Sequence, residues 1–260
     1  MRRARVRATV ATALAVAVAA SGCGGGDSPG GGGSGISGTV TVFAAASLTE
    51  SFTRIGDDFE AANPGTTVVF NFGGSSGLAT QINEGAPADV FAAAAPRNMA
   101  TVTDAGNADG TPSIFARNQL VIAVARGNPR GIRGLADLAR PGTAVALCAE
   151  QVPCGAAART ALDAASVDLT PVTLEQDVKG ALAKVRLGEV DAALVYRTDA
   201  AAADDDVSAV EFPESARAVN DYPIVALADA PNPAGARAFV AYVRSDAGRA
   251  ALTGAGFQTP

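Results

Sequence analysis

Residues 43–50 read Phe-Ala-Ala-Ala-Ser-Leu-Thr-Glu, and they mark the point where a short apolar strand runs into a serine that opens a helix. The helix is indicated by apolar residues that recur at spacings of four, three and four, namely Leu48, Phe52, Ile55 and Phe59. Small side chains and a hydroxyl at a helix N-terminus suit an anion, because unpaired N–H groups point outward there. The same residues also fit a capping box, in which Ser47 caps its own helix and Glu50 bonds back.

A second serine turn follows the next predicted strand. Residues 66–72 read Thr-Thr-Val-Val-Phe-Asn-Phe, and they are followed by Gly-Gly-Ser-Ser-Gly at 73–77 and by a short helix carrying Leu78 and Ile82. One such turn is a weak signal, because glycine and serine follow many strands. Two of them within the first 90 residues strengthen the prediction of an anion site.

Strands and helices alternate along the rest of the chain. Strands are predicted within 85–91 and at 119–125, 143–147 and 191–196, and helices at 97–105, 131–139, 155–164 and from Val178 to Gly188. Residues 119–125 are continuously apolar, which is typical of a strand buried on both faces of a parallel sheet, and Asp177 is placed to cap the last helix. This alternation predicts a mostly parallel α/β fold, with ligands beyond the carboxyl ends of the strands.

The N-terminus predicts export. Four arginines within the first seven residues precede an apolar run at 10–20 and then Ala-Ser-Gly-Cys at 20–23. The run is too short to remain as a membrane-spanning helix. We therefore expect a signal peptide over residues 1–22, a lipid on Cys23 and a Gly/Ser-rich tether over 23–38. The alternative is a general secretory signal with an incidental cysteine.

Charge argues against nucleic acid as a partner. Residues 1–22 carry four of the 20 basic residues and none of the 26 acidic ones, so their removal takes the net charge from −6 to −10. The chain also contains no basic run. An anion must therefore be bound by local geometry, because the net field does not attract it.

The absence of histidine argues against an enzyme. Serine and cysteine nucleophiles usually depend on a histidine base, and neither a G-x-S-x-G elbow nor a phosphate-binding loop is present. A secreted hydrolase that uses Ser47 would need another base, and the lysines are Lys179 and Lys184. A carboxylate pair stays open as a catalytic device. Two cysteines without histidine fall short of a zinc site.

The remaining cysteines form an even pair. If Cys23 carries lipid, Cys148 and Cys154 are left in an exported and therefore oxidising setting. Their spacing permits a disulfide that closes a tight loop over residues 148–154. The alternative is two free thiols.

Five segments, taken in order, resemble the motifs of the ModA-type molybdate-binding proteins of ABC transporters. They are Val-Phe-Ala-Ala-Ala-Ser-Leu-Thr at 42–49, Gly-Ala-Pro-Ala-Asp-Val-Phe at 85–91, Val-Pro-Cys-Gly at 152–155, Asp-Val-Lys-Gly-Ala-Leu at 177–182 and Leu-Val-Tyr at 194–196. Tyr-Pro-Ile at 222–224 and the closing helix through Phe239, Val243 and Phe257 also fit, so the resemblance covers residues 39–260.

The resemblance implies a two-lobed periplasmic-binding-protein fold of type II. Each lobe would be a mixed, mostly parallel sheet flanked by helices, with lobe one at 39–117 plus 218–260 and lobe two at 118–217. The implied function is capture of molybdate, and also tungstate, and its delivery to the permease of an ABC transporter. We further expect a monomer without a cofactor. The alternative is a protein of the same fold for sulfate or another small anion.

Carried over by residue, the resemblance places five ligands around the anion. They are the hydroxyl of Ser47, that of Ser75 (with Ser76 left open), the backbone N–H groups of Cys154 and Val178, and the hydroxyl of Tyr196. Without the resemblance, Val178 and Tyr196 would be read as core residues and Ser75 as a turn serine. A set of uncharged donors favours fully deprotonated ions such as molybdate, tungstate and sulfate, because the proton of monohydrogen phosphate needs an acceptor.

Overall fold

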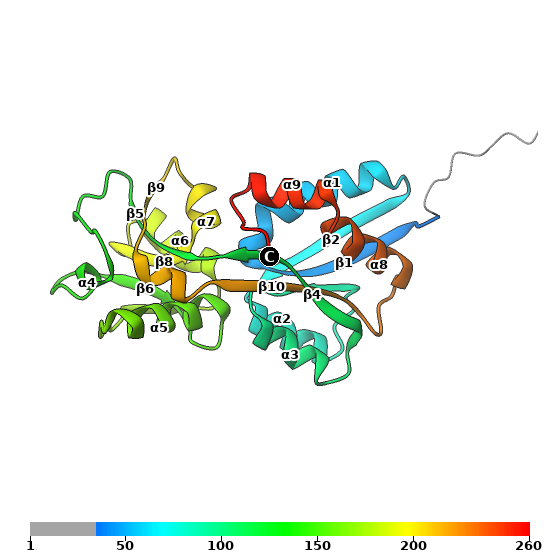
Figure 1. The fold of residues 1–260 in the computed structure, drawn as a ribbon, viewed down its shortest axis with the longest axis horizontal. Helices are drawn as coiled ribbons and strands as arrows, with labels where there is room; N and C mark the ends of the chain where they lie inside the picture. Colours follow the sequence, from blue (N-terminus) through cyan, green and yellow to red (C-terminus); the bar gives the residue numbers. More distant parts are fainter. Residues whose placement is uncertain (1–34) are drawn as a thin grey trace, which may run out of the picture. The chain divides into compact units, whose positions relative to one another are not determined.

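A computed structural model describes residues 35–260, which form two five-stranded sheets flanked by helices (Figure 1). The predicted signal peptide, Cys23 and the tether up to residue 34 lie outside the described residues. Within residues 35–260, no helix is both long and apolar enough to cross a bilayer.

The first sheet has the strand order β2-β1-β3-β10-β4. Its strands are β1 (Gly38–Ala45), β2 (Thr66–Gly73), β3 (Val90–Ala92), β4 (Ala108–Asn118) and β10 (Asn220–Leu227). One face is covered by α1, α8 and α9 and the other by α2 and α3 (Figure 1). These helices are α1 (Thr49–Ala62), α2 (Ser75–Asn83), α3 (Pro96–Thr103), α8 (Pro233–Val243) and α9 (Asp246–Gly254).

The second sheet has the order β7-β6-β8-β5-β9. Its strands are β5 (Leu120–Ala125), β6 (Val145–Cys148), β7 (Thr173–Glu175), β8 (Ala192–Tyr196) and β9 (Val207–Val210). Helices α5 and α6 both pack on β5, β6 and β8. The helical segments of this part are α4 (Leu135–Leu138), α5 (Pro153–Ala165), α6 (Val178–Arg186), α7 (Arg197–Ala201) and the 3₁₀ helix η2 (Pro213–Arg217).

The chain passes from the first sheet to the second between β4 and β5, and it returns between β9 and β10. In each sheet four strands share one direction. The reversed strand is the first one after a crossing, β5 in the second sheet and β10 in the first. The predicted α/β fold with two mixed sheets is therefore confirmed. We call the two parts lobe one, which contains the first sheet, and lobe two, which contains the second.

Two local predictions were wrong. Residues 119–125 were expected in a parallel sheet, but β5 is antiparallel to both β8 and β9, because continuous apolarity reveals burial and not strand direction. Of the helix expected at 131–139, only α4 (Leu135–Leu138) is helical. Asn128 explains the loss, because its side chain accepts from the N–H of Ile132 and donates to the carbonyl of Ile132, which holds this segment as a turn.

Aromatic packing fixes α1 on the first sheet. Phe52 lies in the middle of the core, with its ring centroid 5.7 Å from that of Phe115 and 6.0 Å from that of Phe239. Phe59 lies about two turns further along α1 and packs edge to face on Phe239. Since η1 (Ala46–Leu48) runs directly into α1, this anchoring also fixes the position of Ser47.

Candidate functional site

Ser47 lies in the 3₁₀ helix η1, between the end of β1 and the start of α1, and is only 4% exposed. Its Oγ lies 2.9 Å from the hydroxyl oxygen of Tyr222 on β10. The alternative of a capping box is wrong, because α1 begins at Thr49 without a side-chain cap. Glu50 bonds to the ammonium group of Lys179 instead, at 2.6 Å. The Ser47 hydroxyl is thus free of any role in its own helix.

Ser75 is the first residue of α2 and is 1% exposed. Its Oγ accepts a hydrogen bond of 3.0 Å from the backbone N–H of Ala94, which follows β3. Because an amide can only donate, the Ser75 hydroxyl proton remains available for another acceptor. Ser76 is partly exposed and lines a cavity of about 340 Å³ with Gln151 and Gln176. Burial therefore distinguishes the two serines that the sequence left open.

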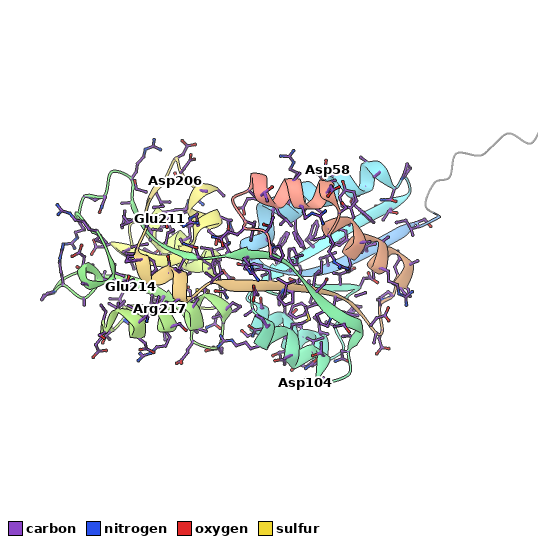
Figure 2. All side chains as sticks on the ribbon, in the orientation of Figure 1. Asp58, Asp104, Asp206, Glu211, Glu214 and Arg217 are labelled. Atoms are coloured by element: carbon purple, nitrogen blue, oxygen red, sulfur yellow. A yellow bond between two sulfur atoms is a disulfide. The ribbon has the colours of Figure 1, made fainter. Side chains whose placement is uncertain are left out.

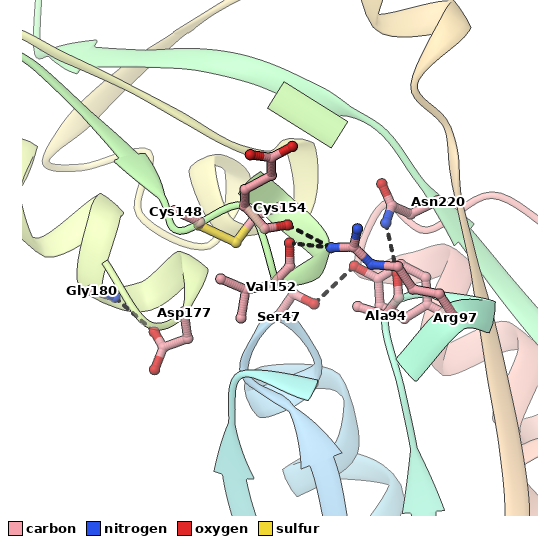
Figure 3. Close-up of a disulfide and its surroundings, with 11 residues drawn as sticks. Ser47, Ala94, Arg97, Cys148, Val152, Cys154, Asp177, Gly180 and Asn220 are labelled. Carbon is pink, nitrogen blue, oxygen red and sulfur yellow. Dashed lines mark hydrogen bonds between the residues drawn. A yellow bond between two sulfur atoms is a disulfide. The ribbon is translucent and has the colours of Figure 1, made fainter. Parts of the chain in front are cut away.

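Cys154 lies in the first turn of α5, directly after Pro153. Proline has no N–H, so the amide of Cys154 is the first donor of this helix, in the turn where amides have no intrahelical acceptor. The disulfide Cys148–Cys154 joins the end of β6 to this turn (Figure 3). The covalent link holds the amide at a defined place.

Val178 is the first residue of α6. Asp177 caps the helix as predicted, because its carboxylate accepts from the N–H of Gly180 at 2.8 Å (Figure 3). The side chain of Val178 is buried in the core of lobe two. The core role and an anion-binding role do not exclude each other, since only the backbone N–H would contact the ligand.

Tyr196 ends β8 and is 1% exposed. Its hydroxyl oxygen has no hydrogen-bond partner at bonding geometry among residues 35–260, although the hydroxyl of Tyr222 is a polar neighbour. Burial raises the pKa of Tyr196 well above its usual value, so the phenol keeps its proton. A buried hydroxyl without a partner costs about 1–3 kcal/mol. The hydroxyl is therefore available to a ligand, and its role as one stays a prediction.

Contacts between the lobes bring these residues to one boundary. The helix η1 packs against α6, and the rings of Tyr196 and Tyr222 meet edge to face at 5.9 Å. At Gly74, beside Ser75, a Cβ atom would overlap the carbonyl oxygen of Gln176 and lie 2.7 Å from Cγ1 of Val152. Donors from both lobes thus gather in a region shielded from water. Their role as ligands stays a prediction.

Arg97 of α3 is a residue that the sequence analysis missed. Its guanidinium donates from Nη2 to the carbonyl oxygens of Glu150 and Val152, at 2.8 and 2.9 Å (Figure 3). These carbonyls belong to the cysteine loop of lobe two, so Arg97 bridges the lobes. No sequence pattern predicts such a contact, because its acceptors are backbone carbonyls and every residue has one.

Lys179 forms a second bridge. Its ammonium lies 2.6 Å from Oε1 of Glu50 in lobe one and 3.0 Å from Oδ1 of Asp199 in α7, whose side chain is 0% exposed. Burial raises the pKa of Asp199 to about 6, although Lys179 opposes the rise. Burial alone would lower the pKa of Lys179, but Asp199 and Glu50 outweigh it, and the net direction is upward. Lys179 is thus charged and engaged with carboxylates.

The chemistry of the boundary fits an anion better than a cation. Residues 35–260 contain no cluster of acidic, cysteine and histidine side chains that could hold a metal ion. Exposed acidic residues such as Asp58, Asp104, Asp206 and Glu211 point outward from helices and loops (Figure 2). Among the acidic residues that the structure describes, Asp89 and Asp199 are buried and the others are at least partly exposed, while the buried boundary also presents N–H and O–H donors.

Known proteins are similar to this chain in sequence and in fold. A profile of the family described as "Bacterial extracellular solute-binding protein" matches residues 40–258. A Mycobacterium tuberculosis protein named "Molybdate-binding protein ModA" is 49% identical over 222 residues, covering 85% of each chain. The Azotobacter vinelandii periplasmic molybdate-binding protein matches with a TM-score of 0.73 at 21% identity, over 85% of this chain and 99% of that one. The sulfate-binding protein SubI of M. tuberculosis matches with 0.73 at 20%, over 85% and 86%. The last two show the fold alone.

Proposed function

Because this chain belongs to the ModA-type family of bacterial extracellular solute-binding proteins, which are transport components rather than enzymes, we propose that it captures molybdate between its lobes and delivers it to the permease of an ABC transporter. The observation that carries the proposal is the buried hydroxyl of Tyr196, which has no partner among residues 35–260. It supports a bound acceptor next to Ser47, with Ser75, Cys154 and Val178 as the other donors.

Uncharged donors can supply the required affinity. Burying a dianion is costly, and a single ion pair rarely repays the lost hydration. A hydrogen bond to a charged group contributes about 1.5–3 kcal/mol, so five of them supply about 8–15 kcal/mol before the lobes close. Nanomolar binding requires about 12 kcal/mol. The donor set is therefore sufficient without a cationic ligand, and Arg97 and Lys179 are engaged elsewhere.

We extend the proposal to three further points. Tungstate should bind as well, because it is a tetrahedral dianion like molybdate. Residues 1–22 would direct export, and a lipid on Cys23 would hold the monomer at the outer face of the membrane near its permease. The lobes, with boundaries near Asn118 and Ala218, would close on the ligand by hinge motion.

Calorimetry with molybdate, tungstate, sulfate and phosphate tests the proposed function directly. Ser47→Ala and Tyr196→Phe are each expected to weaken molybdate binding about 10- to 100-fold, since each removes one bond to a charged group. Tyr242→Phe in α8 is the matched control and should bind like the wild type. Unchanged affinity in both site variants would remove them from the site. Stronger binding of sulfate than of molybdate would favour the alternative function.

Loss of the disulfide should weaken both stability and binding. Cys148→Ser/Cys154→Ser is expected to lose about 2–3 kcal/mol of stability by the chain-entropy relation for a short loop, which corresponds to about 5–10 °C in Tm. Molybdate affinity should fall about tenfold, because the Cys154 amide loses its covalent support. Thermal melts and calorimetry with and without reductant measure both effects. Equal affinity before and after reduction of the wild type would contradict the role of the loop.

A further inference from the structure

Asn220 lies where the chain returns to lobe one, as the first residue of β10. It pairs with Asn118, the last residue of β4, at which the chain leaves the same lobe. The two asparagines are 9% and 2% exposed, so each buries a side-chain amide at a crossing between the lobes. A buried amide needs hydrogen-bond partners, and the partner of each asparagine shows which part of the protein it supports.

The side chain of Asn220 supports the segment between β3 and α3. Its Nδ2 donates to the carbonyl oxygen of Ala94 at 2.7 Å (Figure 3). The donor of this bond is fixed by chemistry, because a carbonyl oxygen can only accept. The preceding residue, Ala93, donates its N–H to the carbonyl oxygen of Pro223 at 2.9 Å. Strand β10 thus holds this segment at two neighbouring points.

Ala94 in turn supports Ser75. The N–H of Ala94 donates to the Oγ of Ser75 at 3.0 Å, and this bond is buried as well. Since an amide N–H can only donate, the bond uses a lone pair of the Ser75 oxygen and leaves the hydroxyl proton for another acceptor. Two hydrogen bonds with defined donors therefore connect the side chain of Asn220 to the hydroxyl of Ser75.

We propose that Asn220 is a positioning residue, which holds Ala94 so that the Ser75 hydroxyl keeps the orientation in which it donates to the bound anion. The inference rests on the proposed function and deepens it. Without the amide of Asn220, the buried carbonyl of Ala94 would lose this donor, and the segment would shift toward another one. The bond from Ala94 to Ser75 would then weaken, and the hydroxyl would be free to rotate away from the ligand.

The test is a double-mutant comparison of molybdate affinity by calorimetry. Asn220→Ala should weaken binding about three- to tenfold, because the bond from Ser75 to the anion becomes poorer. In a Ser75→Ala background the same substitution should change the affinity by less than about twofold, since the hydroxyl that Asn220 positions is already absent. In a Ser47→Ala background it should again weaken binding about three- to tenfold, because Ser47 bonds to the hydroxyl of Tyr222 instead.

Asn118→Ala is the matched control. It also removes a buried asparagine at a crossing, but the Nδ2 of Asn118 donates to Oγ1 of Thr198 in lobe two. Its effect on affinity should be the same in the wild type and in both serine backgrounds. Thermal melts of every variant separate a loss of stability from a loss of affinity. If Asn220→Ala does not fold, Asn220→Ser keeps a smaller donor and allows the same comparison.

Three outcomes would contradict these expectations. Equal losses from Asn220→Ala in the Ser75→Ala and Ser47→Ala backgrounds would show a merely structural role and overturn the inference. Wild-type affinity of a folded Asn220→Ala protein would overturn it as well. Failure of the wild type to bind molybdate would instead overturn the proposed function, and the inference with it.

Discussion

Replacing Gly74 with alanine is expected to weaken molybdate binding about a thousandfold or more. A Cβ at this position would overlap the carbonyl oxygen of Gln176 and crowd Val152, both of which belong to lobe two. The closed arrangement of the lobes would then be blocked, and the donors of lobe two could not reach the anion. Loss of the bonds from Cys154, Val178 and Tyr196 corresponds to about 4–9 kcal/mol, which is the basis of the expected factor.

The same substitution should leave the free protein almost unchanged. Gly74 has φ −64° and ψ 129°, which alanine adopts without strain. Glycine is thus required at position 74 by the close approach of lobe two, and not by the backbone conformation of this residue. Thermal melts without ligand should give a Tm close to that of the wild type, while calorimetry shows the loss of binding.

Gly77 provides the matched control for Gly74. It lies in α2, three residues after the N-cap Gly74, and a Cβ there would meet nothing within 4 Å. Gly77→Ala should bind molybdate normally and gain slightly in stability, because alanine favours a helix. Scattering profiles should show closure on ligand for this variant and none for Gly74→Ala. An affinity of Gly74→Ala within threefold of the wild type would disprove the proposed obstruction.

Replacing Lys179 with methionine is expected to cost about 3–5 kcal/mol of stability at neutral pH, as measured when one partner of a buried ion pair is removed. The carboxylate of Asp199 would be left in a buried place without its neutralising partner. For a domain of this size the loss corresponds to about 10 °C in Tm. Glu50→Gln is the control, because Glu50 is half exposed and its pair with Lys179 should contribute about 0–1 kcal/mol.

The pH profile separates this explanation from a general loss of packing. The folded-state pKa of Asp199 is raised to about 6, so the stability provided by its protonated form is lost as pH rises through that value. Without Lys179 the pKa of Asp199 should rise further, since Lys179 lowers it. Lys179→Met should therefore recover stability below about pH 6. Lys179→Met/Asp199→Asn should show no such recovery, and identical profiles for the two would refute the argument.

Local signals in the sequence predicted much of the fold. The spacing of Leu48, Phe52 and Phe59 identified α1, and Asp177 was recognised as a cap because its pattern involves only nearby residues. The extent of α4 and the direction of β5 were not predictable, since a side-chain turn at Asn128 and the pairing of distant strands decide them. Local patterns thus indicate elements, but not their partners.

The candidate site shows the same difference between local patterns, which can be predicted, and distant contacts, which cannot. Residues that act from the start of a helix or the end of a strand, such as Ser47 and Tyr196, could be proposed from their local motifs. Three other residues have partners that are far away in the sequence. Arg97 bonds to the backbone carbonyl of Val152, 55 residues away, and Tyr222 bonds to Ser47, 175 residues away. Gly74 lies against the backbone carbonyl of Gln176, about a hundred residues away. Only the folded arrangement reveals that these three residues support the boundary.

Under the proposed function, the two cationic bridges also bear on how the bound anion would be released. Arg97 and Lys179 join the lobes through protein groups alone, so they favour the shut state even when no anion is present. A binding-competent state that is already well populated raises the apparent affinity, because less free energy is needed to select it. Release of the anion then requires more than weaker hydrogen bonds to the anion itself. Under the proposed function, the permease would have to separate both bridges, and a docking surface that competes for the guanidinium and the ammonium would favour release.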